Sequence, residues 1–141
     1  MMRAVLIGMC SAIVCGCAAP SATFPGEERA IVWTAMVAAA ESPEYEDLEL
    51  SRRWIVRENT VWANPQDGRI EVHRLLHRVR RLPMQPEVKE ERDWLFIIRM
   101  FAEEDGVPPT AEFRSRNVAP VPAQVREEAN RYFATVRSLL Q

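Results

Sequence analysis

Two histidines, His73 and His77, are the residues of this chain whose spacing most directly suggests chemistry. A separation of four places both side chains on the same face of a helix or of a strand. A metal site needs a third ligand, and Glu71 is the nearest candidate if the segment is a strand. Five arginines between positions 69 and 81 raise the local positive potential and oppose the binding of a dication. We therefore predict no metal site and no cofactor.

The arginines of the same segment are candidates for binding an anionic surface. Arginine side chains form paired hydrogen bonds with phosphate and carboxylate groups. The partners expected from this chemistry are phospholipid headgroups, an acidic polymer of the cell envelope or an envelope protein. The interpretation favoured over such binding is a solvated basic face without a ligand. The candidate residues are Arg69, Arg74, Arg78, Arg80 and Arg81.

Four tryptophans are many for a chain of this length, and most are expected to be buried in the core or in an interface. Trp54 and Trp62 also permit a second interpretation. If both lie on one strand, their even separation places them on the same side, where they would form an exposed aromatic strip for a peptide or a glycan. The sequence leaves a small-ligand or glycan binder as an alternative function.

Motifs for catalysis are absent from the sequence. It contains no glycine-rich phosphate loop and no nucleophile elbow. Cys10, Cys15 and Cys17 are the only cysteines, so the later part of the chain has no thiol for disulfide formation, zinc binding or nucleophilic attack. The acidic run 103–105 falls at a predicted turn, where carboxylates are usually solvated. We predict a protein that is not an enzyme, with a divergent enzyme as the least favoured alternative.

The N-terminal segment has the order of features typical of an export signal. A positive start at Met1, Met2 and Arg3 precedes an apolar run of eleven residues, 4–14. Eleven residues span only about half of a bilayer core, so the run is too short for a permanent membrane helix. We predict that this segment is removed.

Val14, Cys15, Gly16 and Cys17 resemble the lipobox of bacterial lipoprotein signal peptides. The resemblance implies cleavage after residue 16 and acylation of Cys17 on its thiol and amino groups. It also implies a chain tethered by lipid in the cell envelope, outside the cytoplasm. Ala18, in place of aspartate, resembles lipoproteins sent on to the outer membrane, where the cell has one. The resemblance covers about the first twenty residues. The alternatives are an ordinary secretory signal or a short apolar N-terminal helix whose cysteines have no special role.

Length and charge limit the remaining function classes. The chain after residue 16 has about 125 residues, which is enough for one domain. Without Arg3, the 18 basic residues become 17 against 20 acidic ones, a balance of minus three. This balance argues against nucleic acid as a partner.

Residues 17–26 contain two prolines and small polar residues, which predicts a flexible tether between the lipid and the domain. A helix is expected from about Glu27 to about Glu41, because apolar residues recur at helical spacing and Pro43 follows. A second helix is expected near the C-terminus. Val125, Ala129, Phe133 and Val136 form its apolar face, with Pro122 in its first turn.

The middle of the chain predicts two hairpins. Asp67-Gly68 separates β-prone runs at 54–62 and 70–76, and Asp105-Gly106 separates 94–102 from 110–116, where Phe113 is the expected inward anchor. Residues 82–92 are expected to form a loop. Residues 72–79 and 88–101 also fit helical spacing, but the positions of the Asp-Gly turns favour strands.

We therefore predict one α+β domain at residues 27–141, in which two helices pack on one face of a four-stranded antiparallel sheet. Together with the N-terminal signal, this fold predicts a lipid-anchored envelope protein. Its expected work is binding or envelope assembly, through an edge strand or the arginine-rich hairpin.

Overall fold

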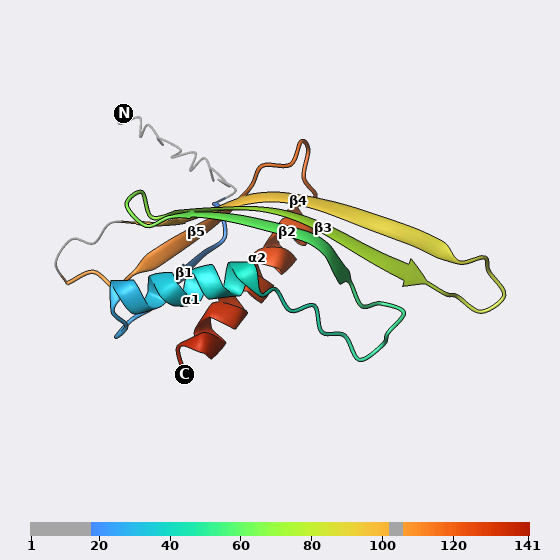
Figure 1. The fold of residues 1–141 in the computed structure, drawn as a ribbon, viewed down its shortest axis with the longest axis horizontal. Helices are drawn as coiled ribbons and strands as arrows, with labels where there is room; N and C mark the ends of the chain where they lie inside the picture. Colours follow the sequence, from blue (N-terminus) through green and yellow to red (C-terminus); the bar gives the residue numbers. More distant parts are fainter. Residues whose placement is uncertain (1–17, 102–105) are drawn as a thin grey trace, which may run out of the picture.

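The computed structural model describes residues 18–101 and 106–141 (Figure 1). This part of the chain forms five strands and two helices. In chain order they are β1 (Ser21–Thr23), α1 (Arg29–Glu41), β2 (Ile55–Asn64), β3 (Arg69–Arg80), β4 (Val88–Met100), β5 (Thr110–Ser115) and α2 (Pro122–Leu139). The predicted signal segment, including Cys17, and the acidic run 103–105 lie outside the described residues.

The strands form one antiparallel sheet in the order β1-β5-β4-β3-β2. From β2 to β5 each strand pairs with the next one along the chain, and β1 adds to the sheet beside β5. Both helices lie on the same side of the sheet (Figure 1). The α+β class, the antiparallel sheet and the two helices on one face are thus confirmed.

Alternation along β3, β4 and β5 explains why the helices cover this side. The buried residues of these strands alternate with more exposed ones, which is the period that places side chains on one face of a sheet. Apart from Arg74 of β3, these buried residues are apolar. The helices complete the core, and the Tyr132 hydroxyl of α2 donates a hydrogen bond to the Met36 carbonyl of α1 at 2.9 Å. Phe113 is fully buried and stacks on Phe96 with ring centroids 4.6 Å apart, so its predicted inward position is confirmed. Among the described residues, the buried hydrophobic residues extend from Ala22 to Val136.

The prediction of a tether at residues 17–26 is wrong for its second half. Ser21–Thr23 form β1, and both Ala22 and Phe24 are buried. The Pro20 carbonyl accepts a hydrogen bond from the Phe113 amide at 2.7 Å, and the Phe24 ring lies 6.4 Å from that of Phe133. A three-residue strand between prolines has little signal of its own, because β5 supplies its hydrogen-bond partners.

The four-strand prediction is therefore corrected to five strands, and the predicted loop at 82–92 is shorter. β3 and β4 both extend past the predicted limits and pair with each other from Arg69↔Arg99 to Arg80↔Val88, which makes a third hairpin. Residues 70–80 and 88–100 are strands, so the helical alternative is excluded for both segments. The two helices lie where the sequence places them, at Arg29–Glu41 and Pro122–Leu139.

Candidate functional site

The sheet face opposite the helices carries side chains in rows that cross the strands. One row runs from Trp62 of β2 through Glu71 and Ile97 to Arg114 of β5. The next row runs through Asn64, Arg69, Arg99, Glu112 and Ser21. Paired residues of antiparallel strands point to the same face, so these rows lie side by side. We call the surface formed by these two rows the open face.

Positive charge exceeds negative charge on the open face and at its border. Arg69 pairs with Glu71 at 2.7 Å and Arg114 pairs with Glu112 at 3.0 Å. Arg116, just after β5, lies 3.6 Å from Glu71. Arg99 adds a fourth guanidinium directly opposite Arg69. Like charges in opposed positions repel each other, and an anion bound between them relieves this repulsion.

A hollow of about 230 Å³ lies among the guanidinium groups of Arg69, Arg99 and Arg114. The Nε atom of Arg69 is shielded from solvent and has no hydrogen-bond partner among the described residues. The volume is below the range of about 300–1,000 Å³ that is typical of small-molecule pockets. A single carboxylate or phosphate group suits a hollow of this size and charge. The residues that line it are Arg69, Ile97, Arg99, Glu112 and Arg114.

Trp62 is 58% exposed and lies at one end of a row of the open face, but Trp54 does not lie on this face. A β-bulge between Val56 and Glu58 inserts an extra residue into β2, which reverses the alternation of side chains. Trp54 instead packs against the core, with the guanidinium groups of Arg78 and Arg92 at 4.2 and 4.6 Å from its ring. The predicted aromatic strip of Trp54 and Trp62 is therefore wrong.

The two histidines lie on the same face of β3, as their spacing requires, but each has a different environment. His73 Nε2 lies 2.9 Å from Asp93 Oδ1, and His77 Nδ1 is buried without a hydrogen-bond partner among the described residues. Glu71, the proposed third ligand, pairs with Arg69. No group of three or more metal-ligating side chains occurs within residues 18–101 and 106–141.

Three of the predicted anion-binding arginines pair with acidic residues of the neighbouring hairpin arm. Arg78 Nε and Arg80 Nη1 both bond Glu90, and Arg81 pairs with Glu87 at 3.0 Å. The hydrogen bond from Arg78 lowers the pKa of the Glu90 carboxyl below its usual value. The stability gained from this pair is therefore present above the pKa of an unfolded glutamate and is lost as the pH falls below it.

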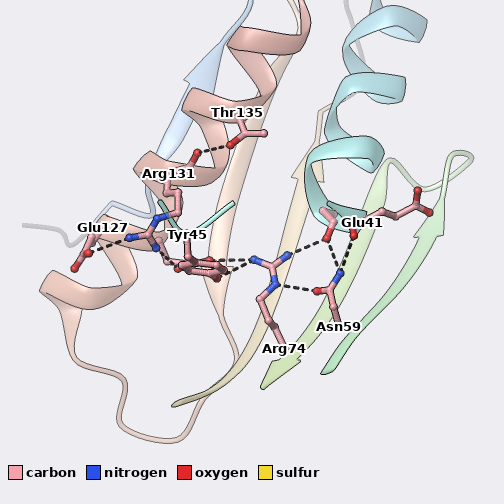
Figure 2. Close-up of polar contacts among 9 residues, drawn as sticks. Glu41, Tyr45, Asn59, Arg74, Glu127, Arg131 and Thr135 are labelled. Carbon is pink, nitrogen blue, oxygen red and sulfur yellow. Dashed lines mark hydrogen bonds and ion pairs between the residues drawn. The ribbon is translucent and has the colours of Figure 1, made fainter. Parts of the chain in front are cut away.

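Arg74 is only 2% exposed, so it lies in the core and not on an exposed anion-binding face. Its guanidinium donates to four groups, each on a different element (Figure 2). Nε donates to Asn59 Oδ1 at 2.8 Å and Nη2 to the Ala40 carbonyl at 2.9 Å. Nη1 donates to the Tyr45 hydroxyl at 3.0 Å and to Glu128 Oε1 at 3.1 Å. This network joins α1, β2, β3, α2 and the segment between α1 and β2.

Glu128 is the anionic centre of this network and is also 2% exposed. The Tyr45 hydroxyl donates to its Oε1 at 2.5 Å, and Arg131 Nη1 donates to its Oε2 at 2.9 Å. Figure 2 shows Tyr45 between the guanidinium groups of Arg74 and Arg131. Burial is the main cause that raises the pKa of Tyr45 and of Tyr132 above the usual tyrosine value. The stability gained from their burial is present below about pH 10 and is lost as the pH rises above it.

Sequence reasoning missed Arg99, Arg114 and Arg116 of the open face and its border. They lie on β4, on β5 and just after β5, so no run of charge in the sequence groups them. The available signal was the alternation of side chains between the two faces of a strand. If the apolar residues Ile98 and Phe113 point inward, their neighbours Arg99 and Arg114 must point outward. Only the strand order brings these outward residues beside Arg69.

No described helix is both long and apolar enough to cross a membrane. The fold is that of an α+β domain with a five-stranded antiparallel sheet and helices on one side. Comparison with protein-family models, with curated proteins and with solved structures finds no match for this chain.

Proposed function

We propose that this chain is a lipid-anchored, non-catalytic binding module of a bacterial cell envelope, held in the membrane by acyl chains on Cys17. The observation that supports a binding role is the open face, where arginines from three strands surround a hollow that suits one anionic group. The partner is an envelope polymer or protein that presents carboxylate or phosphate groups. Anchoring raises the local concentration of the module beside such a partner.

The anchor is tested by expressing the full chain and a Cys17→Ser variant in a bacterium. We expect the parent chain to begin at Cys17, to gain the mass of its acyl chains and to fractionate with membranes. The variant should be neither cleaved at this position nor acylated, because serine lacks the thiol that accepts the lipid. Intact-mass spectrometry measures cleavage and acylation, and membrane fractionation measures whether the chain is bound to the membrane. A parent chain of unmodified mass in the soluble fraction would refute the anchor.

Binding by the open face is tested with a double variant, Arg69→Gln and Arg114→Gln, in purified residues 18–141. Two fluorescent probes, poly-γ-glutamate and polyphosphate, distinguish carboxylate from phosphate chemistry by fluorescence anisotropy. We expect the double variant to bind the preferred probe about tenfold or more weakly, because hydrogen bonds between charged groups are lost.

The matched control is Arg52→Gln with Arg57→Gln, which removes the same charge from exposed positions away from the open face. This control should bind almost as tightly as the parent. Equal weakening by both double variants would show a response to net charge alone. That result, or failure of the parent to bind either probe, would refute an anion site on the open face.

A further inference from the structure

The described chain begins beside the loop that joins β5 to α2. In the register of β1 with β5, Ser21 lies opposite Glu112 and Thr23 opposite Thr110. Residues before Ser21 therefore continue beside the C-terminal end of β5. Ala18, Ala19 and Pro20 line a groove of about 640 Å³ together with Arg114, Pro120 and Arg126. Cys17 directly precedes Ala18 in the sequence.

The same region carries exposed apolar and basic side chains, which we call the loop patch: Arg116, Val118, Val121 and Arg126. Val118 is 98% exposed and Val121 is 52% exposed. Arg116 is 58% exposed, and Arg126 has no ion-pair partner among the described residues. In Figure 1 the loop is drawn in orange and rises on the side of the sheet away from the helices.

Asn117 holds this loop in place. Its Nδ2 donates to the Asp93 carbonyl at 2.7 Å, and its Oδ1 accepts from the Leu95 amide at 3.0 Å. Ala119 has a positive φ of 48°, a conformation that non-glycine residues adopt only where the surrounding structure imposes it. The fold therefore presents Val118 outward at a defined position.

We infer that the loop patch is a docking surface for an anionic phospholipid bilayer, which orients the domain on its own membrane. The inference rests on the proposed anchor at Cys17. Only Ala18, Ala19 and Pro20 separate that residue from β1, and three extended residues reach about 10 Å at most. The anchor thus keeps the patch at the headgroups, where valines enter the interface and arginines meet lipid phosphates. A partner on the neighbouring open face would then lie close to the membrane.

The test uses the mature acylated protein in vesicles, with Val118→Cys as its single free thiol carrying an environment-sensitive fluorophore. Quenching by a lipid that carries a nitroxide near its headgroup measures contact with the membrane. We expect strong quenching at position 118 in vesicles that contain phosphatidylglycerol. Val107→Cys is the matched control, because Val107 is 52% exposed but precedes β5, at the opposite end of that strand. Its label should be quenched much less.

The charge of the patch is tested with Arg116→Gln and Arg126→Gln in the labelled Val118→Cys protein. Each arginine near an anionic membrane surface contributes a factor of about five, so the ratio of docked to undocked molecules should fall about 25-fold. The control pair Arg52→Gln and Arg57→Gln should leave it unchanged. Equal quenching at positions 118 and 107 would overturn the docking surface, and equal quenching in neutral vesicles would overturn its anionic lipid specificity.

Intact mass and fractionation of the same samples separate the two proposals. A chain that is not acylated and does not reach the membrane refutes the anchor itself. An acylated, membrane-bound chain whose label at position 118 stays unquenched refutes only the docking surface and indicates that the patch faces another partner.

Discussion

Replacing Glu128 with alanine should lower the free energy of unfolding by about 3–5 kcal/mol. Arg74 would remain buried with its charge, and it would lose the only carboxylate that its guanidinium contacts among the described residues. The Tyr45 hydroxyl would lose its acceptor as well. A buried charge without a counter-ion costs far more than the loss of an exposed ion pair. Urea denaturation followed by circular dichroism measures the difference.

Glu127→Ala is the matched control, one residue earlier on α2. The Glu127 side chain is 63% exposed and pairs only with Arg131 among the described residues, at 3.2 Å. Its replacement should cost no more than about 1 kcal/mol. If the two variants lose similar stability, Glu128 does not compensate the charge of Arg74. A double variant, Arg74→Met with Glu128→Leu, should recover much of the loss, because it removes both buried charges.

Gly68→Ala should lower the free energy of unfolding by about 2–4 kcal/mol. Gly68 has a φ of +58°, which costs a residue with a side chain about 1–2 kcal/mol. A Cβ atom at this position would also lie 2.5 Å from the carbonyl oxygen of Met100. β4 must then move away from the turn, which weakens the 2.7 Å hydrogen bond from the Met100 amide to the Gly68 carbonyl. This loss costs about a further 1–2 kcal/mol.

Gly26→Ala separates the two causes of this loss. Gly26 also has a positive φ, of +82°, but no neighbouring atom lies within 4 Å of the Cβ position. It should therefore show only the conformational cost, and thermal or urea unfolding of both variants gives the contribution of the contact with Met100. Equal losses in the two variants would mean that the turn and β4 adjust without cost. Since Gly68 precedes Arg69, a displaced turn should also disturb the hollow of the open face.

The two helices and the class of the fold could be predicted because their signals are local. In α2, apolar residues at three- and four-residue spacing match the buried residues Ala129, Tyr132, Phe133 and Val136. In the strands, Phe113 and its alternating neighbours identify the face that packs on the helices. Periodicity of this kind depends on the backbone geometry of one element, so it can be read without knowing the partners of that element.

Features that depend on contacts between distant segments could not be predicted. β1 exists because β5 offers it hydrogen-bond partners, although the paired residues Thr23 and Thr110 are 87 positions apart and the intervening chain forms most of the sheet. The bulge between Val56 and Glu58 changes the face on which Trp54 lies, and pairing with β3 is what defines that bulge. Counting alternate positions along β2 alone therefore does not show on which face Trp54 lies.

By itself, the amino-acid sequence determined the apolar pattern of the elements, the turn glycines and the order of features at the N-terminus. Tertiary structure decided which arginines are buried, paired or gathered at a surface. Arg74 and Arg78 are four residues apart on one strand, yet Arg74 lies in the core and Arg78 stacks on Trp54 and pairs with Glu90. The physical reason is that the free energy of a charge depends on solvent and on partners from other elements, which only the folded chain brings together.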